Sequence, residues 1–255
     1  MIGAIRMVQR NALVYRRVWR GSVCSSFLQP SLFLMAMGLG LGAMIDAAGA
    51  ALPGGVNYAE FLAPGLLAAT AMQTAAFESA WPLLGKMMWH RNYEAVVATP
   101  MSVRDLVFGE LAWIAIRSTT IGVAFVLVMI GFGIPRSPAV VLAIPAAVLT
   151  GLAFAAPIMA YTATLKHSNP FNVLFRFVLT PLFLFSGVFV PLSRLPEPVA
   201  RAAWFTPLFH GVELVRGFTL DAVPATWPIH VVYLLALIAA GIAVAQRTFR
   251  RRLYS

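Results

Sequence analysis

Six long stretches of apolar sequence limit what this chain can fold into more than any other feature. They cover residues 22–45, 58–84, 105–132, 137–162, 171–192 and 228–246, and charged residues are rare within them. A membrane hydrocarbon core about 30 Å thick needs about 20 apolar residues per helix. Only 11% of the 255 residues are charged, too few to cover the surface of a soluble domain of this size. The sequence therefore predicts one all-α integral membrane domain, residues 1–255, with six transmembrane helices.

Lysine and arginine are distributed unevenly between the predicted loops. Thirteen of the 19 lie in the N-terminal segment, the loops after the second and fourth spans, and the C-terminal tail, against four in the opposite loops. Loops rich in these residues remain in the cytoplasm. We therefore expect a multi-pass protein of the bacterial cytoplasmic membrane with both termini cytoplasmic. This orientation accounts for the net charge of +10 without any nucleic acid partner. The single cysteine, Cys24, cannot form an internal disulfide, and no metal site is expected.

The N-terminal segment, residues 1–21, predicts an amphipathic helix. Five arginines fall within about 120° of arc on a helical projection: Arg6, Arg10, Arg16, Arg17 and Arg20. Apolar residues occupy the opposite side: Ile5, Val8, Ala12, Tyr15 and Trp19. Such a helix lies in the inner membrane interface, with its arginines at the lipid headgroups. The alternative is a frayed cytoplasmic tail.

A polar strip, WHRNYEAVVATP at residues 89–100, separates the second and third spans. Asn92 can cap a short helix, and Pro100 would end it. Ser102 and Asp105 then form a capping box that starts the third span. One interpretation is a capped loop without a partner. The other is a docking element through which a soluble protein moves the two adjoining spans.

Two blocks of the sequence resemble a known family. WHRNYEAVVATPMSVRDLVFGE looks like the cytoplasmic loop of type-2 ABC exporter permeases, and FSGVFVPLSRLPEPVARAAWFTPLFHGVELVRG resembles the second hallmark of that family. With EFLAPGLLAATAM, the spacing is most similar to the nodulation-type lipo-oligosaccharide exporter permeases. The similarity extends over nearly the whole chain. The two motif blocks are typical of the superfamily and not of one substrate.

The resemblance implies an assembly of two permease copies, a homodimer, with two ABC ATP-binding subunits. ATP and Mg would be bound by the partner subunits, and the permease would contact membrane lipids. Residues 86–100 would form the coupling helix that contacts the ATP-binding subunit. Its contact and shaping residues would be Lys86, His90, Arg91, Tyr93, Glu94, Thr99 and Pro100.

The chain has no ATP site of its own, because its only Gly-Lys pair, Gly85-Lys86, fails the G-x-x-x-x-G-K-[ST] pattern at both ends. No catalytic residues are expected: H-E-x-x-H is absent, and Ser186-Gly187 lacks the glycine that a nucleophile motif needs. We predict an ATP-driven exporter of an amphipathic substrate, a lipid, glycolipid or hydrophobic drug. The alternative is a gradient-driven transporter of small hydrophobic compounds, although no repeated half is evident.

An apolar, proline-rich segment, residues 191–222, precedes the last span. It predicts two short helices, one over 196–203 and one that Thr206 caps with Pro207 in its first turn. Both are too short to span a membrane, so re-entrant helices in the outer leaflet are expected. The candidate outer gate comprises Pro191, Pro207, His210, Glu213 and Arg216. The alternative is a surface loop with a local Glu213–Arg216 ion pair.

Four charged residues fall in or near the spans: Glu78, Glu110, Arg117 and Arg176. Unpaired charges are costly there, so Glu78–Arg117 or Glu110–Arg176 pairs are expected, serving either structure or a polar transport path. In the first span, Gly38 and Gly42 form a G-x-x-x-G pair, which suits either a dimer contact or internal helix packing.

Overall fold

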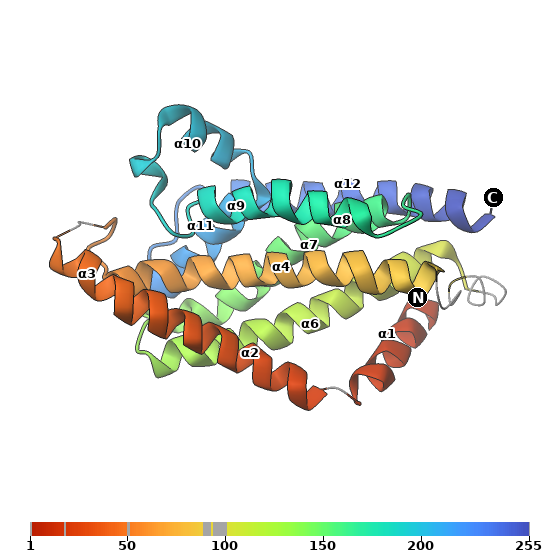
Figure 1. Cartoon of the computed structure of the whole chain (residues 1–255), viewed down its shortest axis with the longest axis horizontal. Coiled ribbons are helices and arrows are strands. Elements are labelled where there is room, and N and C mark those ends of the chain that lie inside the picture. Colours follow the sequence, from red (N-terminus) through yellow and green to blue (C-terminus); the bar gives the residue numbers. More distant parts are fainter. Residues whose placement is uncertain (1, 18, 50–51, 89–92, 94–100, 255) are drawn as a thin grey trace.

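The computed structural model describes residues 2–17, 19–49, 52–88, 93 and 101–254 (Figure 1). Within these ranges all regular structure is helical, as predicted. The longer helices are α1 (Ile2–Tyr15), α2 (Trp19–Phe33), α4 (Tyr58–Met88), α6 (Val103–Gly131), α7 (Ala143–Thr162), α11 (Pro207–Leu220) and α12 (Trp227–Tyr254). The shorter ones are η1 (Leu34–Leu41), α3 (Gly42–Ala47), η2 (Pro138–Leu142), α8 (Asn169–Leu174), η3 (Phe175–Leu179), α9 (Thr180–Phe185), η4 (Leu192–Arg194) and α10 (Glu197–Trp204).

Four helical segments are long and apolar enough to cross a membrane: Trp19–Ala47, Val103–Gly131, Pro138–Thr162 and Trp227–Tyr254. They coincide with four of the six predicted spans. The predicted second span is the continuous 31-residue helix α4, which carries several polar side chains. The predicted fifth span, 171–192, corresponds to a shorter apolar helix, Asn169–Phe185, after which the chain leaves helical geometry. The fold is thus an all-helical bundle with four candidate membrane spans among the described residues.

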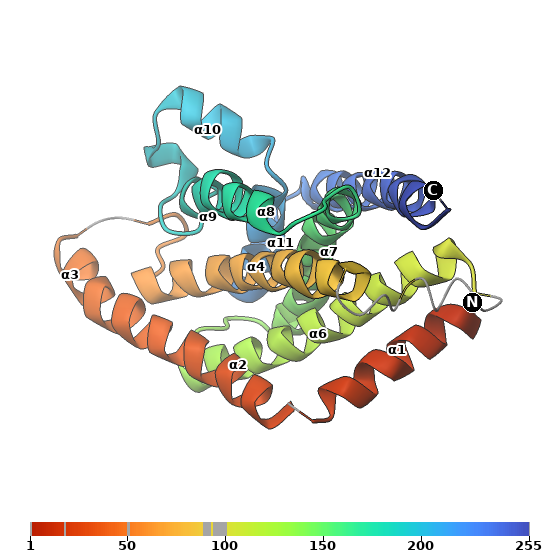
Figure 2. The same cartoon turned by 45° about the vertical axis from the view of Figure 1, so that its right-hand side comes forward.

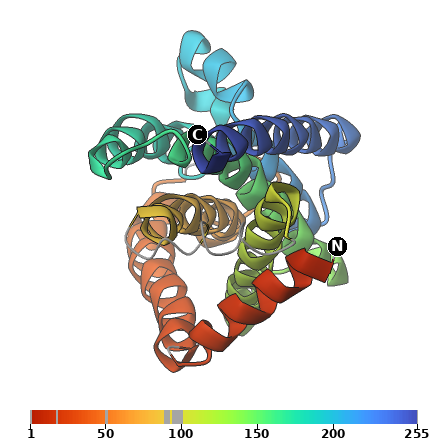
Figure 3. The same cartoon turned by 90° about the vertical axis from the view of Figure 1, so that its right-hand side faces the viewer.

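The bundle is built around α4 and α7, which are rich in alanine. Most alanines of both helices are buried, and a Cβ added at Gly151 of α7 would lie 3.1 Å from the backbone oxygen of Ala71 in α4. Small residues let two backbones approach closely, which is the usual basis of packing between membrane helices. α6, α11 and α12 complete the bundle, and α2 and α8–α9 flank α4 on opposite sides (Figure 3).

Two glycines set the close crossings of α11 and α12 with α7. A Cβ at Gly211 of α11 would lie 2.1 Å from Oγ1 of Thr150, and one at Gly241 of α12 would lie 2.7 Å from the backbone nitrogen of Pro157. Both Thr150 and Pro157 belong to α7. The positions of α11 and α12 therefore depend on the absence of a side chain at these two sites.

The helix ends largely follow the local signals in the sequence. Ser102 and Asp105 form the predicted capping box at the start of α6. Thr206 accepts a hydrogen bond from the backbone of Phe209, with Pro207 in the first turn of α11. The N-terminal helix is observed over Ile2–Tyr15, and a new helix begins at Trp19. As Figure 2 shows, α1 and α2 meet at an angle along one side of the bundle.

The helix that follows α7 is not uniform. Between α8 and α9, residues Phe175–Leu179 form the π-helix η3, in which hydrogen bonds join residues five apart. The hydroxyl of Thr180 also bonds to the carbonyl oxygen of Phe175, at 2.9 Å. A second π-helix, η1, lies between α2 and α3, and its Gly38 packs against α4, with an added Cβ 3.2 Å from Cβ of Ala59. Gly42, at the start of α3, faces Tyr58 of α4 in the same way, so the glycine pair supports packing within the chain.

The start of α1 and the end of α12 lie at the same end of the bundle, beside the end of α4 and the start of α6 (Figure 1). The segments α3 and α10 lie at the opposite end. This arrangement separates the end of α4 and the start of α6 from the region around residues 191–222.

Candidate functional site

The helix α4 exposes one polar stripe. Between residues 61 and 80, all positions are buried except five, which are spaced three and one apart on a single helical face. These are Thr70, Gln73, Thr74, Phe77 and Glu78. A helix that is otherwise buried among apolar neighbours thus directs hydroxyl, amide and carboxylate groups towards one side.

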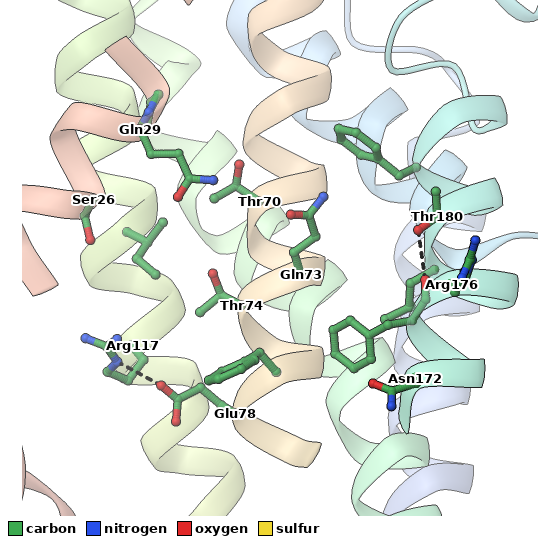
Figure 4. Close-up of a pocket in the computed structure, with 16 residues that line it drawn as sticks. Ser26, Gln29, Thr70, Gln73, Thr74, Glu78, Arg117, Asn172, Arg176 and Thr180 are labelled. Carbon is green, nitrogen blue, oxygen red and sulfur yellow. Dashed lines mark hydrogen bonds and ion pairs between the residues drawn. The ribbon is translucent and has the colours of Figure 1, made fainter. Parts of the chain in front are cut away.

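This stripe forms the floor of a groove of about 980 Å³. The walls come from α2 and α6 on one side and from α8, η3 and α9 on the other (Figure 4). Polar side chains lie on every wall: Ser26, Gln29, Arg117, Asn172, Arg176 and Thr180. Aromatic rings of Phe77, Phe175 and Phe183 line the same space. The groove therefore offers hydrogen-bonding groups and apolar surface side by side.

Glu78 and Arg117 form the predicted ion pair at one end of this groove. Nε of Arg117 lies 3.4 Å from Oε1 of Glu78, and both side chains are mostly buried. The guanidinium also lies over the ring of Tyr15 at the end of α1, 4.5 Å from its centroid. The pair joins α4, α6 and α1 and places two charges at the groove (Figure 4).

The prediction that Glu110 pairs with Arg176 is wrong. Arg176 lies on η3 at the groove and is exposed, with its guanidinium 6.0 Å from the ring centroid of Phe177. Glu110 lies on α6 and pairs instead with Lys86 near the end of α4, at 2.7 Å. The reason is that α6 packs directly against α4, whereas η3 lies on the other side of α4.

Glu110 is the centre of a second polar site, the Glu110 cluster, defined as Asn11, Lys86, Tyr93 and Glu110. Besides Lys86, the carboxylate accepts hydrogen bonds from the Tyr93 hydroxyl at 2.9 Å and from the Asn11 amide at 3.2 Å. The Lys86 ammonium also donates to the Asn11 amide oxygen at 3.2 Å. Glu110 is only 2% exposed and Tyr93 only 1%. A buried carboxylate is stable in such a place because each oxygen has partners.

Tyr93 is held firmly by this environment. Its ring packs against Phe249 of α12, with centroids 6.1 Å apart. Burial and the neighbouring Glu110 carboxylate raise the pKa of the Tyr93 phenol well above its ordinary value. The phenol is therefore neutral at any physiological pH and acts as a hydrogen-bond donor to Glu110.

The other residues of the predicted coupling helix are placed only in part. Lys86 and Tyr93 belong to the Glu110 cluster. Five residues lie outside the described part of the chain: His90, Arg91, Glu94, Thr99 and Pro100.

The residues of the predicted outer gate separate into two groups. His210 is fully buried, and its Nδ1 lies 2.7 Å from Nδ1 of His230 on α12. Arg216, further along α11, donates hydrogen bonds to the carbonyl oxygens of Gly187 at 2.8 Å and Phe61 at 3.3 Å. Glu213 and Arg216 are 3.5 Å apart, as expected for a local ion pair.

These contacts do not bring His210 and Arg216 to one shared polar surface. His210 faces α12, whereas Arg216 faces α4 and the segment before η4. The two prolines lie at the bounds of these elements: Pro191 is buried just before η4, and Pro207 opens α11.

Sequence reasoning missed two parts of these sites. Asn11 lies among the arginines of the N-terminal segment, so nothing in its neighbourhood indicates burial against α6. The polar stripe of α4 could have been found from the sequence, because Thr70, Gln73, Thr74 and Glu78 recur at helical spacing in an apolar run. A search for polar residues on one face of each span would have found it.

Comparison with known proteins agrees with this architecture. A family model described as ABC-2 type transporter matches residues 4–220. Nodulation protein J of Rhizobium leguminosarum bv. viciae is 32% identical over 245 residues, 96% of this chain and 93% of that protein. Nodulation protein J of Sinorhizobium fredii (strain NBRC 101917 / NGR234) is 31% identical over 98% of this chain and 94% of its own length. The inner membrane transport permease YadH of Escherichia coli (strain K12) is 22% identical over 91% of this chain and 90% of its own length.

Proposed function

The chain belongs to the family of ABC-2 type transporters, and from this premise we propose that it is the permease subunit of an ATP-driven exporter of an amphipathic substrate. A membrane transport permease of this family carries the route for the substrate, and a separate ABC ATP-binding subunit supplies the energy. The proposed direction of transport is outward across the cytoplasmic membrane.

The observation that supports this proposal best is the polar stripe of α4. Exposing Gln73, Glu78 and the other polar groups directly to lipid tails would be costly, because hydrocarbon offers no hydrogen-bond partners. A second permease copy placed over the groove would enclose these groups in a shared, wet passage. The proposed functional unit is therefore a homodimer with the two grooves facing each other.

The lining of the groove favours a substrate with a polar head and an apolar chain. Amide and hydroxyl groups of Gln29, Gln73, Asn172 and Thr180 suit the hydroxyls of a sugar or another polar headgroup. The phenylalanine rings in the same groove suit a hydrocarbon chain. A lipid-linked saccharide fits both, in line with the resemblance of the sequence to lipo-oligosaccharide exporter permeases.

The energy source is proposed to be a pair of ATP-binding subunits that hold ATP and Mg. They would dock on residues 86–100 at the end of the bundle where α1 begins and α12 ends. This end would face the cytoplasm with both termini, as its arginines and lysines require. The six-span arrangement would use α4 and Asn169–Phe185 as the second and fifth crossings, with α10 and α11 as re-entrant helices on the outer side.

Reconstitution into vesicles tests the proposal. The probe is a fluorescent lipid that carries an oligosaccharide headgroup, and its movement between leaflets is measured with and without ATP. ATP-dependent movement is expected only when the permease and the ATP-binding subunit are both present. Movement driven by a proton gradient with the permease alone would contradict the proposal and favour a secondary transporter.

The groove itself is tested by narrowing it. Thr74→Trp places an indole on the groove floor and should lower ATP-dependent movement of the probe by about tenfold or more, because the substrate loses its space. Val232→Trp on α12 is the matched control, since Val232 is 64% exposed and does not line the groove. Equal transport by Thr74→Trp and Val232→Trp would show that the substrate passes elsewhere.

A further inference from the structure

The Glu110 cluster joins parts of the chain that are far apart in sequence. Asn11 comes from α1, Lys86 from the last turn of α4, Glu110 from α6, and Tyr93 from the connection between α4 and α6. The ring of Tyr93 adds α12 through its contact with Phe249. Three helices, α1, α4 and α6, therefore meet at one buried carboxylate near the proposed docking surface, and α12 joins them through Tyr93.

We infer that Glu110 is a positioning residue that locks Tyr93 to α1, α4 and α6, so that a push on the connection moves these helices together. This inference rests on the proposed function, because it assigns the route by which force from an ATP-binding subunit enters the permease. Without the Glu110 cluster, the connection between α4 and α6 could move while the helices stayed in place. ATP would then be hydrolysed without transport.

The Glu110 carboxylate accepts two hydrogen bonds at each of its oxygens. Oε1 accepts from Lys86 at 2.8 Å and from Tyr93 at 2.9 Å, while Oε2 accepts from Lys86 at 2.7 Å and from Asn11 at 3.2 Å. A carboxylate has about four acceptor positions, and here protein groups take all of them. Such charge-assisted bonds are directional as well as strong, which apolar contacts between helices are not. The cluster can therefore transmit rotation and tilt.

Burial makes the hydrogen bonds of the Glu110 cluster costly to break. Asn11, Tyr93 and Glu110 are each at most 6% exposed, and the Lys86 side chain is 19% exposed. Breaking one bond would leave a charged group without a partner and without full access to water, which is much costlier than exchanging a bond with solvent. The Glu78–Arg117 pair at the groove is longer, at 3.4 Å, and does not include Tyr93 of the connection. The Glu110 cluster is therefore the better candidate for transmission.

The contact from α1 gives the N-terminal helix a part in this assembly. Met7 of α1 packs on Gly109, the residue before Glu110. A Cβ added at Gly109 would lie 2.6 Å from Cβ of Met7. Close packing and the Asn11 hydrogen bond thus fix α1 to the same turn of α6. A helix that only rested on the membrane surface would not need a polar residue buried against Glu110.

Tyr93→Phe tests this inference with the smallest possible change. The substitution removes one hydroxyl and leaves Lys86 and Asn11 on the carboxylate. Because Tyr93 lies in the proposed docking segment, transport is expressed per ATP hydrolysed by the assembled complex. The number of probe lipids moved per ATP hydrolysed should fall about tenfold, the size of one bond to a charged group. Tyr161→Phe on α7 is the matched control, because Tyr161 is 40% exposed and outside the cluster.

A double-mutant cycle separates positioning from general stability. In a Lys86→Met/Glu110→Gln background the charged acceptor is already gone, so adding Tyr93→Phe should change the transport-to-ATP ratio by less than about twofold. Asn11→Leu, which keeps the side-chain volume but removes both polar contacts, should lower the same ratio from the α1 side. It also serves as the second variant if Tyr93→Phe does not assemble.

The outcomes are distinct. A Tyr93→Phe or Asn11→Leu complex that transports as many lipids per ATP as the wild type would overturn the positioning role, even if its thermal stability were lower. An unaltered effect of Tyr93→Phe in the double-mutant background would overturn it as well. If the wild-type complex itself shows no ATP-dependent transport, the proposed function fails, and this inference fails with it.

Discussion

Gly211→Ala is expected to destabilise the protein by about 2–3 kcal/mol, because the new methyl group would have to occupy space that α7 already fills. An added Cβ would lie 2.1 Å from Oγ1, 2.5 Å from Cγ2 and 2.8 Å from Cβ of Thr150. Thr150 is fully buried and cannot move away without disturbing α7. The measurement is thermal or denaturant unfolding of the purified protein in detergent.

The second-site variant Thr150→Ala provides the control for this prediction. It removes two of the three colliding atoms, so the double variant should recover about half of the lost stability. Gly241→Ala should not be rescued in this way by Ala156→Gly, because the backbone nitrogen of Pro157 and the backbone carbon of Ala156 would still lie 2.7 and 2.8 Å away. Equal rescue at both sites would contradict the view that α12 meets the backbone of α7.

Arg216→Leu is expected to destabilise the protein by about 2–4 kcal/mol, since it removes a buried donor to two carbonyl oxygens, of which that of Gly187 lies outside any helix. The guanidinium donates to Gly187 and Phe61, and its central carbon lies 4.0 Å from the ring centroid of Phe61. Arg216→Lys should lose about half as much, because an ammonium has no planar fork and cannot stack on the ring in the same way.

Arg201→Leu is the control for the arginine variants. Arg201 lies on α10 and pairs only with Glu197 among the described residues, and both side chains are more than 70% exposed. An exposed pair of this kind contributes little, so the change should stay within about 0.5 kcal/mol. If Arg216→Leu lost as little stability as Arg201→Leu, the hydrogen bonds from Arg216 to Phe61 and Gly187 would not be what holds α11 in place.

Local features of the fold could be predicted from the sequence because their causes are local. The apolar runs determine where α6, α7 and α12 lie, and the capping residues Ser102 and Thr206 set the starts of α6 and α11. The short helix near residues 196–203 and the Glu213–Arg216 contact also follow from nearby residues. In each case the interacting groups are separated by no more than a few positions.

The sites depended on which helices become neighbours, and the sequence does not contain this information in a local form. Several basic residues could have paired with Glu110, depending on how the helices pack. The contact between α4 and α6 brings Lys86 to it. His210 likewise met His230, 20 residues further along the chain, because α11 and α12 pack together. Hydrophobic patterns indicate that a face is buried but not which partner covers it.

The π-helix η3 has a consequence for how the groove tolerates changes in chain length. A π turn contains one residue more than an α turn, so Phe175–Leu179 behaves like a single-residue insertion that the helix has absorbed. Deleting one residue there would remove the bulge and restore regular α geometry, with the residues after it kept close to their present orientation. Only a second deletion, with no bulge left to absorb it, would turn Thr180 and Phe183 by about 100° away from the wall that they form with α4. The wall of the groove therefore tolerates the loss of one residue in η3 but not of two.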